Sequence, residues 1–202
     1  MYNYGAARAL LARSEGEATA ILNQAGLDVG WIDCPLTTAE LSGHPACLAT
    51  MGTGDFVVKI LSGRAAEGFS SEREILGRAL ECRSGQVGCS AYIFYRDLPE
   101  LAVDAGVSES QLLGHILAHE IGHLLLGSNS HAAAGVMRAQ WGPEDFRTMA
   151  ESLLIFTEQQ ARRLREGVSA LHTIRADDPD WSPEAFASPA GFKNTSLPVP
   201  AH

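Results

Sequence analysis

Two histidines separated by four positions, with a glutamate directly after the first, are the residues in this chain best placed to do chemistry: His119, Glu120 and His123. On an α-helix, residues four apart lie on one face about a turn apart, so both imidazoles can reach one metal ion. Glu120 lies about 100° further around the helix, where it can border the ion without binding it. From there it can accept a proton from water. The pattern therefore predicts a catalytic zinc site with two histidine ligands and Glu120 as general base.

A catalytic zinc ion usually has three protein ligands, so the pattern requires a third residue. His131 lies four residues past Gly127, where the chain has left the helix and can turn back toward the metal. A carboxylate on the next helix, either Glu144 or Glu151, is the alternative. The residues by themselves leave these possibilities open.

Spacing alone allows a different pair, because His115 precedes His119 by four residues. Ile116 follows His115, so this pair lacks the adjacent glutamate. We expect His115 near the site but not on the metal. Histidines that are simply satisfied in a core are the competing interpretation of the whole pattern.

The histidine motif lies in a clearly bounded predicted helix. Ser108, with Gln111 three residues later, resembles a capping box, and apolar residues then recur at helical spacing up to Gly127. A glycine is a common helix terminator. The sequence therefore positions the motif on a central helix.

The remaining elements indicate a mixed α+β chain of one domain. Apolar and β-branched segments predict strands at 2–4, 29–34, 56–61 and 90–95. Helices are predicted at 6–24, from Pro143 onward, and after the capping residue Thr157. A chain of 202 residues can build one well-buried core. We expect a catalytic domain over 1–172 and a tail containing Pro and Asp over 173–202.

Charge and hydropathy exclude two classes of partner. The net charge of −9 argues against nucleic acid, because neutralising phosphates requires clustered Lys and Arg. The longest apolar stretch, 116–127, contains three motif residues and is too short and polar to span a bilayer. Residues 1–20 lack the pattern of an export signal, so we expect any such signal to have been removed.

Four cysteines fall into two local pairs, Cys34 with Cys47 and Cys82 with Cys89. Such pairs are compatible with two disulfides and an oxidising compartment, which favours a secreted or periplasmic protein. Four buried thiols in a cytosolic protein are the alternative.

The extended pattern from His119 to His131 resembles that of the metzincin clan of zinc peptidases, and within it small secreted bacterial metalloproteases. It reads His119-Glu120-x-x-His123-x-x-x-Gly127-x-x-x-His131, followed by Gly135-Val136-Met137. The resemblance implies a zincin-like α+β fold with a small mixed sheet, a central active-site helix and a C-terminal helical lobe. It also implies His131 as the third zinc ligand, Gly127 as the turn out of the helix and Met137 as the floor under the metal.

Two features depart from the usual metzincin pattern. Each gap after the second histidine is one residue longer, and Ala139 stands where the clan frequently has a tyrosine. Oxyanion stabilisation is then expected from the metal alone or from another donor, such as Tyr95 or Arg138.

The expected activity is hydrolysis of peptide bonds by water that zinc activates, with a peptide or protein as substrate. An extended peptide can pair with an exposed sheet edge beside the active-site helix, and 90–95 is the candidate edge. A zinc hydrolase of a non-peptide amide and a non-catalytic zinc-binding module are the alternatives.

Overall fold

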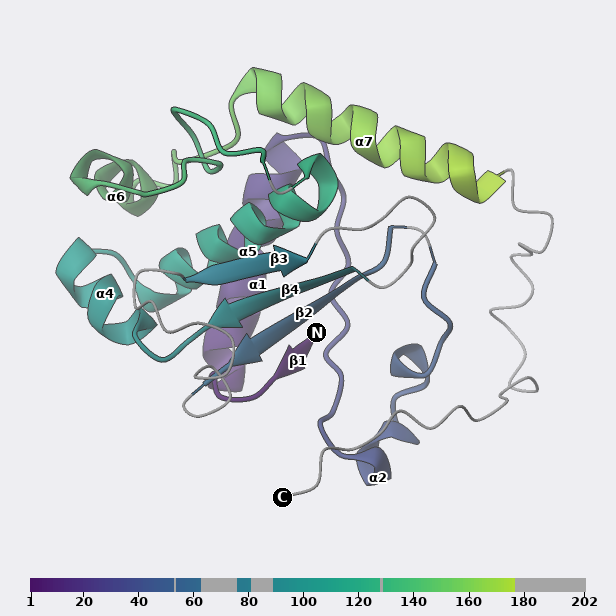
Figure 1. Cartoon of the computed structure of the whole chain (residues 1–202). Helices are drawn as coiled ribbons and strands as arrows, with labels where there is room; N and C mark the ends of the chain where they lie inside the picture. Colours follow the sequence, from purple (N-terminus) through teal and green to yellow (C-terminus); the bar gives the residue numbers. More distant parts are fainter. Residues whose placement is uncertain (53, 63–75, 81–88, 128, 177–202) are drawn as a thin grey trace.

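A computed structural model describes residues 1–52, 54–62, 76–80, 89–127 and 129–176, which form a mixed α+β fold (Figure 1). The strands are β1 (Tyr2–Asn3), β2 (Phe56–Leu61), β3 (Gly77–Leu80) and β4 (Cys89–Phe94). The helices are α1 (Arg8–Gln24), α2 (Thr38–Leu41), the 3-10 turn η1 (Pro45–Cys47), α4 (Leu98–Ala105), α5 (Glu109–Leu126), α6 (Pro143–Ala150) and α7 (Glu158–Ala176).

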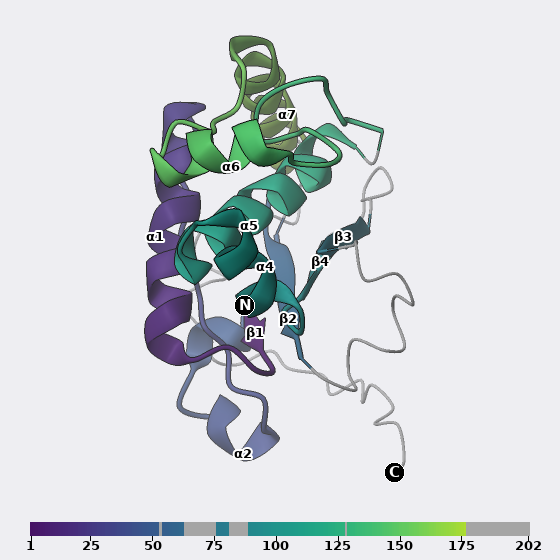
Figure 2. The ribbon, with the colours of Figure 1, turned by 90° about the vertical axis from the view of Figure 1, so that its left-hand side faces the viewer.

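The four strands form one mixed sheet in the order β1-β2-β4-β3. β1, β2 and β4 run parallel, and β3 runs antiparallel to β4 at the sheet edge. Helices α1 and α5 lie on the same side of this sheet (Figure 2). The strands predicted at 2–4, 56–61 and 90–95 are confirmed as β1, β2 and β4.

Two sequence expectations about strands are wrong. Residues 29–34 form no strand; they contribute one isolated bridge, from Cys34 to Tyr2, because the segment lies largely exposed with Ile32 half accessible. Residues 90–95 are not a sheet edge either, since β4 is paired on both sides. The edge strands among the described residues are β1 and β3, and β3, the one beside β4, is too short to give a periodic signal in the sequence.

Helix α5 begins and ends as the sequence predicts. Ser108 Oγ accepts from the Gln111 amide at 3.1 Å, and the Gln111 side chain accepts from the Ser108 amide at 3.1 Å. Gly127 ends the helix with φ 92° and ψ 162°, so it is not the left-handed helical cap but a more extended conformation that is essentially restricted to glycine. The chain can therefore leave the helix sharply at this residue.

The two later helices also follow their sequence signals. α6 begins at Pro143, and α7 begins after Thr157, whose amide and hydroxyl exchange hydrogen bonds with Gln160. α7 continues to Ala176, past the expected domain end at 172. The rest of the expected tail, 177–202, lies outside the described residues.

The predicted disulfide between Cys34 and Cys47 is present, with the two Cα atoms 5.6 Å apart. The second predicted pair includes Cys82, which lies outside the described residues. A disulfide is compatible with an extracellular location. Among the described residues, every helix falls short of the length and apolar character needed to span a bilayer.

Gly114 allows α5 to pack closely against α1. A methyl group at this position would lie 2.5 Å from Cβ of Glu17 and 2.9 Å from the carbonyl oxygen of Ser14, both on α1. The second of these atoms is backbone and cannot rotate away. The two helices can approach this closely only because position 114 carries a hydrogen atom where other residues carry Cβ. This close contact fixes the position of α5 relative to α1.

Gly114→Ala should destabilise the protein by about 1–3 kcal/mol, because the helices must separate, and this outweighs the better helix propensity of alanine. Urea unfolding measures the change. Gly16→Ala is the matched control, since Gly16 lies on α1 with no other atom within 4 Å of the added methyl. Equal stability of the two variants would contradict the close-packing argument.

Candidate metal centre

Three histidine side chains from two segments converge on one point. His119 and His123 come from α5, and His131 comes from the loop that follows Gly127. Nε2 of His123 lies 3.0 Å from Nε2 of His119 and 3.1 Å from Nε2 of His131. All three ligand atoms lie within 4.8 Å of one another. The structure therefore brings together the three residues that the sequence nominated.

The spacing of these nitrogens fits a tetrahedral metal ion. Zn–N bonds of about 2.0–2.1 Å at tetrahedral angles separate two ligand nitrogens by about 3.3 Å. Burial lowers the pKa of His119 to about 4, so its ring is neutral at pH 7, as a ligand must be. The cluster could hold a metal ion, and its three-nitrogen donor set suits zinc among several divalent metals.

The other ring nitrogen of each helical histidine is held by the loop after α5. His119 Nδ1 donates to the carbonyl oxygen of Val136 at 2.7 Å. His123 Nδ1 lies 2.9 Å from Ser130 Oγ, which donates its own proton to the Gly127 carbonyl at 2.6 Å. A ring that donates from Nδ1 keeps the Nε2 lone pair for a metal. Both rings are therefore oriented for binding through Nε2.

Met137 anchors this loop to α5. Its side chain is fully buried and in van der Waals contact with Gly122, where an added methyl would collide with the sulfur. The Met137 carbonyl accepts from the Ala132 amide at 2.8 Å, which closes the loop on itself. Gly135 turns the chain with φ 76° against the Ile155 carbonyl. The contact at Gly122 positions Val136, and through it His119.

The alternative ligands lie elsewhere. Glu144 pairs with Arg147 on the exposed face of α6, and Glu151 is exposed at the end of that helix. Neither belongs to the metal-ligand group found among the described residues. His115 is buried and donates to the Gln111 carbonyl at 2.7 Å, one turn before His119 on α5.

Trp141 lies between His115 and the cluster. Its ring centroid is 6.3 Å from that of His115 and 5.7 Å from that of His119, edge-on to both. The indole nitrogen donates to the Val136 carbonyl at 3.3 Å. His115 is therefore near the site through Trp141, as expected, and is not itself in the cluster.

Glu120 is a buried carboxyl beside the histidines, with only 5% of its surface exposed. The backbone of Ala79 on β3 donates one hydrogen bond to it, and its Oε2 atom has no partner among the described residues. Burial raises the pKa of Glu120 to about 8. A buried acceptor without a partner is costly unless a ligand or water supplies one. Buried groups with strongly shifted pKa values occur frequently at functional sites.

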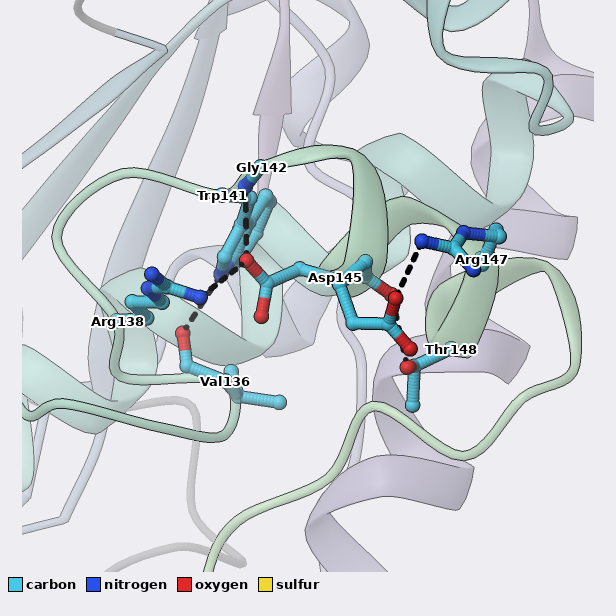
Figure 3. Close-up of polar contacts among 8 residues, drawn as sticks. Val136, Arg138, Trp141, Gly142, Asp145, Arg147 and Thr148 are labelled. Carbon is cyan, nitrogen blue, oxygen red and sulfur yellow. Dashed lines mark hydrogen bonds and ion pairs between the residues drawn. The ribbon is translucent and has the colours of Figure 1, made fainter.

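The histidines and Glu120 line a common cleft of about 880 Å³. β3 contributes one wall, and α4 and the segment 138–141 contribute the others. Arg138 lines the cleft and pairs with Asp145 at 2.9 Å, while Asp145 also accepts from the Gly142 amide at 2.8 Å (Figure 3). Of the two nominated oxyanion donors, Arg138 is thus at the site.

Tyr95, the other nominated donor, does not line this cleft. Its hydroxyl donates to Glu109 at the start of α5, and burial raises its pKa to about 12. The hydroxyl is therefore already engaged away from the histidines.

Sequence reasoning did not find two supports of the site. Ser130 orients His123, and its position beside His131 was the only signal that could have suggested it. β3 holds Glu120 through Ala79, and nothing local in the sequence indicates a strand there.

Comparison with known protein families, curated proteins and solved structures finds no match to this chain. The functional assignment consequently depends on the geometry of the site.

His131→Ala should lower zinc affinity more than about 100-fold, because removing a direct ligand exceeds the effect typical of outer partners. Competition with a zinc chelator dye measures the change. Glu151→Ala is the control and should bind zinc like the wild type. Zinc lost from Glu151→Ala but kept by His131→Ala would assign the third ligand to the carboxylate.

Glu120→Gln should alter the pH dependence of stability in the metal-free protein. The folded state keeps a proton on Glu120 that the unfolded chain releases above its ordinary pKa of 4.5. This stabilising contribution is fully present below pH 4.5 and is lost as pH rises to about 8. The stability of Glu120→Gln relative to wild type should therefore increase over that range. Urea unfolding in the presence of a chelator, at pH 4.5 and at pH 8, measures the two free energies of unfolding. A difference between the two proteins that stays constant with pH would contradict the raised pKa of Glu120.

Proposed function

We propose that this protein is a zinc-dependent peptidase in which His119, His123 and His131 hold the ion and Glu120 is the general base. One observation carries the proposal. Three imidazole nitrogens converge in a cleft that is also lined by a buried carboxyl, one oxygen of which has no partner among the described residues. The same cleft therefore contains a candidate metal site and, in Glu120, a candidate proton acceptor.

The chain's own residues divide the chemistry among them. A zinc ion with three protein ligands keeps a fourth position for water and lowers the pKa of that water. Glu120 takes the proton of the attacking water and delivers it to the leaving amine. Its burial suits this role, because a carboxyl with a pKa near the working pH both accepts and releases a proton readily. Arg138, which lines the cleft, is the candidate donor to the oxyanion.

The sheet edge favours a peptide as the substrate. The Phe94 amide donates to the Leu76 carbonyl at 2.9 Å, so the alternating pattern of an antiparallel ladder turns the backbone groups of Gly77 and Ala79 away from β4. The Ala79 amide is used by Glu120, which leaves both Gly77 groups and the Ala79 carbonyl for a peptide. Both residues line the cleft. An extended peptide could therefore add to β3 as a further strand, with its scissile bond near the histidines.

The two alternative functions are less well supported. A structural zinc site usually has four protein ligands, whereas the group found among the described residues has three. Such a site would also have no use for the buried carboxyl of Glu120. A hydrolase of a non-peptide amide would share the metal and the base, but it would not need an open strand edge beside them. The Cys34–Cys47 disulfide favours action in a secreted or periplasmic setting.

Glu120→Gln should retain zinc and lose hydrolysis of fluorescein-labelled casein by about 10²–10⁴-fold, because an amide cannot accept the proton of water. Metal content is read by mass spectrometry of the native protein. Ser42→Ala serves as the control for handling and metal loading. Ser42 is exposed at the C-terminal end of α2 and does not line the cleft. Normal casein turnover by Glu120→Gln would remove Glu120 from the proposed role. Cleavage of small amides but not of casein by the wild type would favour the non-peptide hydrolase.

A further inference from the structure

Gly77 lies directly against the carboxyl of Glu120. A methyl group at Gly77 would lie 2.7 Å from Cδ and 2.8 Å from Cγ of Glu120, and would collide with Oε1. Three consecutive atoms of one side chain thus occupy the space that any other residue at position 77 would need. The three heavy atoms nearest to such a methyl group all belong to Glu120.

The strand that contains Gly77 also holds the carboxyl by a hydrogen bond. Ala79, two residues further along β3, donates its backbone amide to Glu120. In this ladder the backbone groups of Gly77 and Ala79 are both directed away from β4, so Gly77 provides the gap and Ala79 provides the donor along the same edge of β3. Together they fix both the depth and the direction of the carboxyl group.

We infer that Gly77 is a positioning residue for the general base, an inference that rests on the proposed peptidase function. Its missing side chain lets Glu120 lie against β3 and keep the Ala79 hydrogen bond. A side chain at position 77 displaces the carboxyl toward the cleft. The base is then misplaced relative to the water that it must deprotonate.

This change should lower catalysis while leaving stability almost unchanged. The atoms that must yield belong to a flexible side chain, not to backbone, so the cost to folding is small. Alanine and valine are also better strand residues than glycine. Misplacing a catalytic group by about 1 Å can nevertheless cost about 100-fold in rate. If Gly77 were needed only for folding, its replacement would instead reduce stability strongly, and activity would fall only as folded protein is lost.

The test compares Gly77→Ala and Gly77→Val with the wild type, all zinc-loaded, and uses Gly16→Ala as the control because that methyl meets no atom within 4 Å. For labelled casein we expect kcat to fall by about 10- to 100-fold in Gly77→Ala and further in Gly77→Val. KM should change little, because the backbone groups that would pair with a peptide remain. Zinc content and the unfolding midpoint should match the wild type.

A second measurement does not depend on activity. Hydrogen exchange of the Ala79 amide, followed by NMR, should be about tenfold or more faster in Gly77→Ala and in Glu120→Ala, because both lose a hydrogen bond to a carboxyl. If the wild type fails to cleave casein, the peptidase proposal fails, but this exchange rate still decides how Glu120 is positioned. Unchanged Ala79 exchange in Gly77→Ala overturns the inference. Loss of zinc or of folding in parallel with kcat also overturns it, since Gly77 would then be structural.

Discussion

Helix α5 must carry ionisable side chains through the interior of the protein. His115, Glu120 and His123 are all buried on it, among apolar residues that pack against α1 and the sheet. Buried polar groups are costly unless each finds a hydrogen-bond partner. The helix provides one such partner, the Gln111 carbonyl that accepts from His115, but most of its backbone groups are used in its own turns. His119, Glu120 and His123 therefore find their partners in neighbouring segments, and this requirement explains how the site is built.

The segment after α5 meets most of this requirement. It leaves the helix at Gly127, supplies Ser130 to one histidine, supplies the Val136 carbonyl to another, and adds His131 as a third donor. The burial of Met137 against α5 holds these groups in register. One loop thus both completes the cluster and orients the rings from α5, so a metal and the fold of this loop should stabilise each other.

β3 meets the rest of the requirement from the opposite side. It donates the Ala79 amide to Glu120 and leaves room for the carboxyl at Gly77. Among the described strands, the same short strand lies at one edge of the sheet, and it forms one wall of the cleft. A peptide that paired with this edge would therefore be aligned with Glu120, the proposed general base, by a common backbone. Binding and proton transfer would depend on one element, which keeps the distance between them fixed.

The sequence by itself determined the parts whose signals are local. Helical spacing placed two histidines and Glu120 together on α5, and capping residues marked where that helix begins. The tertiary structure alone decided what surrounds them. Residues 29–34 are apolar enough for a strand but are exposed, while β3 is too short to be recognised and yet forms the edge. Register and edge position depend on pairing between distant segments, and the contact between Gly77 and Glu120 joins residues 43 positions apart. No periodicity within a single segment carries that information.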